Sequence, residues 1–165
     1  MEKPSLPVKG AKTQDFVLPD HLNEMVRFSD LCAHRPVLLL FYPTDFGFHC
    51  SIQMGEMREN HERFRALGLQ VVGISTNTTH SHGTWMVNLN IPFRLLSDQR
   101  GEVTRNMGMM MPDDSWLKGR SGRAAFLIDN DLTVIFAWVP PDQSITPDIE
   151  ELYRGCEQAL NGKGP

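Results

Sequence analysis

Two unbroken apolar runs, separated by a stretch with helical periodicity, constrain the fold of this chain more than any other feature. The runs Val37–Tyr42 and Leu69–Ser75 both have the length of a buried strand. Between them, four residues recur at helical spacing on one face: Met54, Met57, His61 and Phe64. A strand, a helix and a second strand form a βαβ unit whose right-handed crossover makes the strands parallel. The sequence therefore predicts the α/β class.

Shorter elements precede and follow this unit. Two short strands are expected at 15–18 and 25–28, around a polar turn, and Ser29 is expected to cap a brief helix. Gly68 is expected to end the long helix. Further along, the patterns predict a helix near 81–89, a short strand at 93–96, a helical turn at 102–107 and an irregular loop over 109–122.

The last third of the chain predicts a hairpin and a terminal helix. Strands at 124–128 and 132–138 are separated by Asp129-Asn130-Asp131, which favours a tight antiparallel connection. Thr146 is expected to cap the final helix and Pro147 to be its first residue. This element order is that of a thioredoxin-like fold: a central mixed sheet flanked by helices, with an N-terminal β-hairpin extension.

Composition limits the possible classes of function. A length of 165 residues with 41% hydrophobic residues favours one core, and hence a single domain over 1–165. The net charge of −4, the pI near 5.8 and the absence of a basic run argue against nucleic acid or anionic membrane as partners. The chain shows no signal peptide and no stretch of transmembrane length. We therefore expect a cytoplasmic protein with reduced thiols.

A turn-rich segment between the first apolar run and the long helix ends in a cysteine. This segment, Pro43–Cys50, places Cys50 at the start of the helix. Backbone N–H groups and the helix dipole concentrate partial positive charge there and stabilise a thiolate. Although free cysteines are often buried apolar residues, this position favours Cys50 as a reactive nucleophile.

Four motifs in register carry a resemblance to a known family. They are Phe41-Tyr42-Pro43-x-x-Phe46-x-x-x-Cys50, Gly73-Ile74-Ser75, Leu95-Leu96-Ser97-Asp98 and Gly122-Arg123-Ala124-Ala125-Phe126-Leu127-Ile128-Asp129. The chain resembles a peroxiredoxin of the alkyl hydroperoxide reductase/thiol-specific antioxidant family over nearly its whole length. The resemblance implies an extended thioredoxin fold and reduction of hydroperoxides. It further implies that Cys50 is the peroxidatic cysteine, that Pro43 shields it and that Arg123 holds the thiolate and the peroxide.

Two positions depart from the family pattern. Gly47 stands where the family carries a Thr or Ser whose hydroxyl bonds the thiolate and the peroxide, and Gln53 stands where many members carry a glutamate. Loss of a preorganised donor can cost on the order of 3 kcal/mol. Substitute donors close in sequence are Thr44, His49 and Ser51. The alternative function is a catalytically weak or inactive thioredoxin-like redox sensor, chaperone or binding protein.

The other two cysteines are expected to be structural. Cys156 lies on the apolar stripe of the last helix, and Cys32 precedes the first buried strand. Cys156 stays open as a resolving cysteine, but the chain lacks the Val-Cys-Pro tail motif of two-cysteine members and has Gly55 where another branch has its second cysteine. A one-cysteine cycle follows, with the sulfenic acid reduced by an external thiol or a thioredoxin- or glutaredoxin-like protein. No cofactor is required.

Remaining chemistry-bearing residues have simple interpretations. His49, His80 and His82 lack the spacing of a metal site, and Thr79-His80-Ser81-His82 suggests a solvated start of a helix. Four methionines form a cluster that is expected mainly to fill space in the core and the loop: Met107, Met109, Met110 and Met111. The alternative is that they line an apolar approach for a substrate or a contact between subunits. Three aromatic residues are mostly core candidates, although the family uses such residues at subunit contacts: Phe46, Phe48 and Trp85. A homodimer is expected by resemblance.

Overall fold

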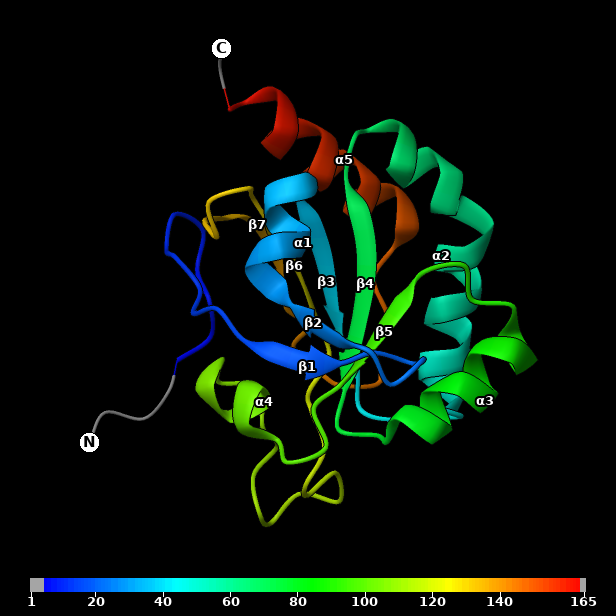
Figure 1. The fold of residues 1–165 in the computed structure, drawn as a ribbon. Helices are drawn as coiled ribbons and strands as arrows, with labels where there is room; N and C mark the ends of the chain where they lie inside the picture. The colour runs from blue at the N-terminus through cyan, green and yellow to red at the C-terminus, as the bar shows by residue number, and fades with distance from the viewer. Residues whose placement is uncertain (1–4, 164–165) are drawn as a thin grey trace.

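A five-stranded mixed sheet with the strand order β5-β4-β3-β6-β7 forms the centre of the structure, a computed structural model that describes residues 5–163 (Figure 1). Its strands are β3 (Val37–Phe41), β4 (Gln70–Ser75), β5 (Arg94–Ser97), β6 (Ala124–Ile128) and β7 (Val134–Trp138). The first three are mutually parallel, whereas β6 pairs antiparallel with β3 and β7. The predicted βαβ unit and hairpin are confirmed. Residues 1–4, on which part of the signal-peptide expectation falls, lie outside the described range.

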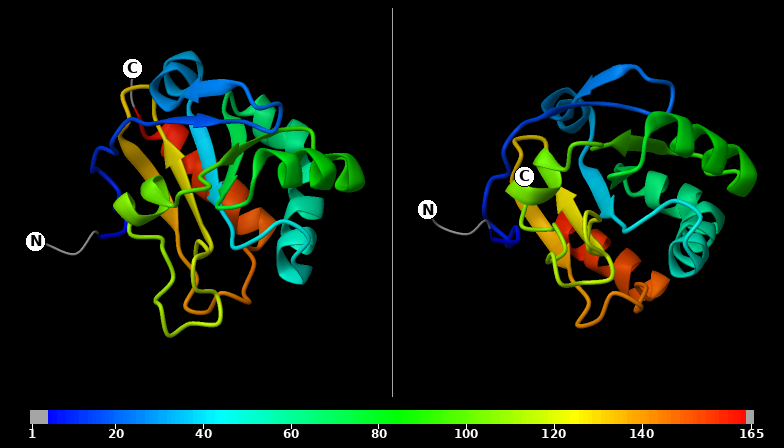
Figure 2. Two further views of the ribbon diagram at one scale, coloured as in Figure 1. Left: turned by 60° about the horizontal axis from the view of Figure 1, so that its bottom comes forward. Right: turned by 90° about the horizontal axis from the view of Figure 1, so that it is seen from below.

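Helices cover both faces of this sheet (Figure 2). On one face lie α2 (Phe48–Ala66), α3 (Thr79–Leu89) and α5 (Ile149–Asn161). The opposite face carries α1 (Phe28–His34), α4 (Glu102–Asn106) and the separate antiparallel hairpin of β1 (Val17–Pro19) and β2 (Met25–Arg27). The thioredoxin-like architecture with an N-terminal hairpin is thus confirmed.

Strand β3 is buried on both faces because it is the middle strand of a covered sheet. Its even-numbered Leu38 and Leu40 face the core under α2 and α5, and its odd-numbered residues face the core under α1 and α4. All five residues of β3 are fully buried. A strand covered on both faces has no polar side, which explains the continuous apolar run in the sequence.

Two predicted helix caps are wrong. Ser29 lies inside α1, and the N-cap position is Arg27. The carboxylate of Asp15 accepts hydrogen bonds from the backbone N and the Oγ of Ser29, at 2.8 and 2.7 Å. The acceptor at this helix start therefore comes from 14 residues earlier, a distance that local sequence patterns do not reveal.

The start of the terminal helix also differs from the prediction. Asp148, rather than Thr146, is the N-cap of α5, and Pro147 lies before the helix. The Asp148 carboxylate accepts hydrogen bonds from the N–H groups of Glu150 and Glu151, both at 3.0 Å. Aspartate is a stronger N-cap residue than threonine, and the helix therefore begins after Asp148. The stop at Gly68 is confirmed, with φ of +89°.

Membrane insertion through a helix has no support in the described range. Within residues 5–163, no helix is both long enough and apolar enough to cross a bilayer.

Candidate active site

Cys50 lies in the first turn of α2, beneath the loop that leaves β3. Gly47 is the N-cap residue of this helix, and Cys50 is only 3% exposed. The loop turns through Phe46, whose φ of +64° is unusual for a residue with a bulky side chain. The loop thus reverses the direction of the chain, and the sulfur of Cys50 faces the N-terminal end of β6.

Arg123, the residue before β6, contacts the sulfur directly. Its Nη2 donates to Cys50 Sγ at 3.4 Å, and its Nη1 donates to Gln53 Oε1 at 2.6 Å. The Nε and the backbone N of Arg123 donate to the backbone and side-chain oxygens of Gln143, the first of them at 3.1 Å. With 2% of its surface exposed, this guanidinium is held in one orientation by both neighbours.

The charge of Arg123 is not neutralised by a carboxylate. Within residues 5–163, no Asp or Glu oxygen lies within 4 Å of its guanidinium nitrogens. Gln53, which is 2% exposed, supplies an acceptor oxygen without negative charge. A buried cation without a counterion is costly, so this arrangement favours a negatively charged group beside the guanidinium.

The substitute donors proposed from the sequence are not aimed at the sulfur. The Thr44 hydroxyl donates to Asp45 O and accepts from Asn77 and Arg120, at 3.1, 3.3 and 3.1 Å. His49 is exposed, and the backbone N of Ser51 donates to Gly47 O within the helix. The hydrogen bond from Arg123 is the single one found at Cys50 Sγ among the described residues.

A pocket of about 270 Å³ leads to Cys50. Buried Pro43 and Arg123 form part of its wall. The rest of the pocket comes from the segment that follows Pro43 and from two further loops: Thr44, Gly47, Phe48, His49, Trp116, Leu117, Gln143 and Ser144. Sequence reasoning missed Gln143 and Trp116, because no local pattern distinguishes either from an ordinary loop residue.

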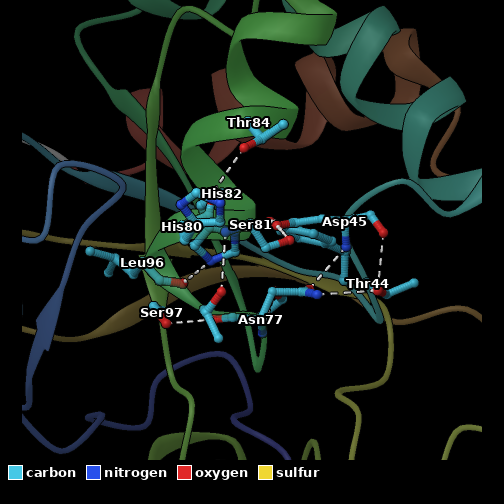
Figure 3. A network of polar contacts seen from close by, with 12 residues as sticks. Thr44, Asp45, Asn77, His80, Ser81, His82, Thr84, Leu96 and Ser97 are labelled. Atoms are coloured by element: carbon cyan, nitrogen blue, oxygen red, sulfur yellow. Dashed lines mark hydrogen bonds and ion pairs between the residues drawn. The ribbon is translucent and has the colours of Figure 1, made fainter.

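A buried polar network lies under the same loop (Figure 3). Asp45 Oδ2 lies 2.7 Å from His82 Nδ1 and accepts from Ser81 Oγ at 2.8 Å, while Tyr42 Oη donates to Asp45 Oδ1 at 2.8 Å. The other ring nitrogen of His82 lies 2.9 Å from Leu96 O. The prediction that the histidines mark a solvated helix start is therefore wrong for His82, which is fully buried because Asp45 provides a partner.

The other interpretations of single residues have mixed outcomes. Trp85 is buried as predicted, but Phe46 and Phe48 are exposed and not part of the core. Phe46 has Trp85 as an aromatic neighbour, and among the described residues Phe48 has only the exposed His49, so both rings keep most of their surface in solvent. Met107 and Met109 are buried in the core under α1 and α4. Within residues 5–163, no group of three or more metal-ligating side chains is close enough to hold a metal ion.

Cys32 and Cys156 are buried on opposite faces of the sheet. Both side chains are inaccessible to solvent, as predicted for packed cysteines. Burial raises the pKa of the Cys156 thiol to about 12 and, with nearby Asp15 and Asp129, that of the Cys32 thiol also to about 12. Neither sulfur is a thiolate near neutral pH, and the three described cysteines form no disulfide.

Comparisons with known proteins identify relatives of this chain. The sequence profile of the AhpC/TSA family matches residues 9–137. A putative peroxiredoxin bcp from Coxiella burnetii is 31% identical over 131 residues, which cover 78% of this chain and 86% of that protein. The 2-Cys peroxiredoxin BAS1 of Hordeum vulgare is 27% identical, over 76% of this chain and 63% of its own length.

Solved structures show the same fold. The crystal structure of peroxidoxin BcpB from Mycobacterium tuberculosis superposes with a TM-score of 0.82 at 24% identity, covering 96% of this chain and 99% of that one. The fold and the site thus define a thioredoxin-like protein with a buried cysteine at a helix start beside an arginine. The chain belongs to the AhpC/TSA family.

Proposed function

We propose that the chain is a thiol-dependent peroxidase that reduces hydrogen peroxide or small organic hydroperoxides through Cys50. The contact of 3.4 Å between Arg123 Nη2 and Cys50 Sγ carries the proposal. An unneutralised guanidinium stabilises the thiolate and attracts the oxygen atoms of a peroxide. The names of the relatives, peroxiredoxins among them, support the same activity.

The reaction follows from the positions of these groups. The Cys50 thiolate attacks one peroxide oxygen, an S–O bond forms and the O–O bond breaks. The departing oxygen takes a proton and leaves as water or an alcohol, while the sulfur is oxidised to sulfenic acid. Arg123, fixed by Gln53 and Gln143, stabilises the negative charge that moves from sulfur to the departing oxygen. Pro43 restricts access to the sulfur.

A one-cysteine cycle is part of the proposal. Cys156 and Cys32 are both fully buried, so neither sulfur is accessible to a sulfenic acid without local unfolding. Reduction is assigned to an external thiol or to a thioredoxin- or glutaredoxin-like protein. A cytoplasmic location and a homodimer complete the proposal.

One experiment tests the activity. Purified protein treated with one equivalent of hydrogen peroxide should gain a sulfenic acid at Cys50, detected by dimedone trapping and mass spectrometry, and no intramolecular disulfide. The Cys50→Ser variant should not react with dimedone and should have no peroxidase turnover with dithiothreitol. If Cys50 of the wild-type protein stays unmodified after this treatment, the proposal is wrong.

A second function is favoured by the missing hydroxyl at residue 47. Without that donor, the protein could keep its fold as a thioredoxin-like redox sensor, chaperone or binding protein. Slow oxidation of Cys50, with little turnover when reductant is in excess, would support a sensor. Turnover at ordinary peroxidase speed that depends on Cys50 would exclude this second function as the main role.

A further inference from the structure

A second pocket, of about 490 Å³, lies at the end of the sheet opposite Cys50. Strands β3, β4 and β5 are parallel, and Cys50 follows the C-terminal end of β3. This pocket is lined instead by Gln70 and Arg94, the first residues of β4 and β5, and by the turn between β1 and β2. Small-molecule sites have volumes of roughly 300 to 1,000 Å³. The two pockets share no residue, so the proposed peroxidase reaction does not use this one.

The floor of the second pocket is apolar. Leu69, Ile91 and Phe93 line it, and each is at most 6% exposed. The ring of His61, which also lines the pocket, lies with its centroid 5.6 Å from that of Phe93. The fold has already ordered these side chains, so a flat apolar group can lie on them without a further cost of ordering.

Three arginines from separate segments line the same pocket: Arg35, Arg65 and Arg94. Arg94 Nε lies 3.7 Å from Asp20 Oδ2, and Arg65 Nη1 lies 3.0 Å from Glu62 Oε1. Among residues 5–163, no carboxylate oxygen lies within 4 Å of the guanidinium of Arg35, which is exposed. Arg35 therefore brings an unpaired positive charge to the pocket.

A polar atom of the pocket wall also lacks a partner. The Nδ1 atom of His21 is buried and, in the described part of the chain, has no hydrogen-bond partner. Burial lowers the pKa of His21; neighbouring Asp20 raises this pKa, but not enough to offset burial and the charge of Arg94. The ring is therefore neutral near pH 7, and in one tautomer Nδ1 can donate to an oxygen of a ligand. Glu24, the other carboxylate that lines the pocket besides Asp20, is exposed, so water and salt screen its charge.

We propose that this pocket binds a small organic anion, a carboxylate or a phosphate attached to a flat apolar ring. The guanidinium of Arg35 binds the charged head, because its planar fork matches the oxygen atoms of either group. His21 Nδ1 donates to a further oxygen of the head, and the ring lies on the apolar floor. The inference goes beyond the peroxidase function and does not depend on it.

The test is a titration of the ¹⁵N-labelled protein at pH 7, followed by heteronuclear NMR. Benzoate and phenyl phosphate are the probes, and at least one should shift the amide signals of pocket residues with a dissociation constant of about 1 mM or lower. Benzyl alcohol, which has the ring without the charge, should bind at least about tenfold more weakly. Inorganic phosphate, which has the charge without the ring, should also bind more weakly than phenyl phosphate.

Two variants remove the proposed polar contacts. Arg35→Gln should raise the dissociation constant about tenfold, and His21→Phe, which keeps an aromatic ring, should raise it severalfold. The matched control is Arg154→Gln, because Arg154 is an exposed arginine on α5 that does not line the pocket. Its affinity should equal that of the wild type. Cys50→Ser should also bind normally, which separates this inference from the peroxidase function.

Four results overturn the inference. One is the absence of saturable shifts at this pocket up to about 10 mM of either probe. Another is equal affinity in Arg35→Gln and the wild type, in protein whose circular dichroism is native. Binding of benzyl alcohol as tight as that of benzoate would show that charge plays no part. Binding of inorganic phosphate as tight as that of phenyl phosphate would show that the apolar floor plays none.

Discussion

The side chain of Thr44 presents its methyl group, not its hydroxyl, to Gly47. A Cβ atom added at residue 47 would lie 3.1 Å from Thr44 Cγ2, 3.3 Å from Thr44 O and 3.3 Å from Cys50 Sγ. The Thr44 hydroxyl is occupied by Asp45, Asn77 and Arg120. The space beside the sulfur, where the resemblance to the family implies a hydroxyl, is therefore bordered by a methyl group in this chain.

This relationship predicts how the missing hydroxyl can be restored. In Gly47→Thr alone, the new Cβ crowds Thr44 Cγ2, so only a small gain in rate is expected. The double variant Gly47→Thr/Thr44→Ser removes that methyl and keeps the hydroxyl at residue 44. Its rate constant for Cys50 oxidation by hydrogen peroxide should exceed the wild-type value by tenfold to about a hundredfold. Stopped-flow or rapid-quench measurements give this constant.

Thr44→Ser by itself is the matched control for the double variant, and its rate should stay close to the wild-type rate. No gain in the double variant would mean that another group already bonds the peroxide, and the helix amides would then be the best candidates.

Gln53 is predicted to act by positioning Arg123. Gln53→Met removes the acceptor at 2.6 Å from Arg123 Nη1 and leaves a similar volume. The rate constant with hydrogen peroxide should fall by about tenfold or more. Gln53→Glu keeps an acceptor oxygen and should retain more activity than Gln53→Met. Equal losses in both variants, measured at the same pH, would contradict a positioning role.

Much of the fold could be predicted because periodicity reports burial directly. The apolar run at β3 and the helical spacing in α2 each identify an element and its buried face. The position of Cys50 follows from the helix start alone. The caps of α1 and α5 could not be placed as well, because Asp15 acts from a distant segment and Asp148 competes with Thr146.

The hydrogen-bond partners of the polar residues in the site could not be predicted from the sequence. Gln143 bonds Arg123 from a loop 20 residues away, and neither residue type nor spacing indicates that contact. His82 looked solvated because its neighbours in sequence are polar, yet its ring lies between Asp45 and Leu96 O. Such pairs depend on the three-dimensional approach of two loops. Asp45, the one acidic residue of the segment Pro43–Cys50, was the available signal.

The Asp45–His82 pair predicts a large effect on stability. His82→Leu leaves the carboxylate of Asp45, which is 4% exposed, without its 2.7 Å partner. Loss of one member of a buried pair should lower the free energy of unfolding by about 3 kcal/mol or more. The double variant His82→Leu/Asp45→Asn removes the charge and should be more stable than His82→Leu. Urea denaturation measures both, and a single variant as stable as the wild type would contradict the prediction.

The free energy of unfolding at alkaline pH should depend on the buried cysteines, because their thiols ionise more easily in the unfolded chain. Burial raises the pKa of Cys156 from 9.0 to about 12. The folded thiol therefore stays neutral between these values while the unfolded chain loses its proton, so this contribution to stability is complete below pH 9 and is lost toward pH 12. Each such cysteine steepens the fall in unfolding free energy by about 1 kcal/mol per pH unit. Cys156→Ala should show a shallower fall over this window, although it is less stable at pH 7 through lost packing. Parallel curves for the two proteins, from urea denaturation at several pH values, would show that Cys156 ionises as easily in the folded state.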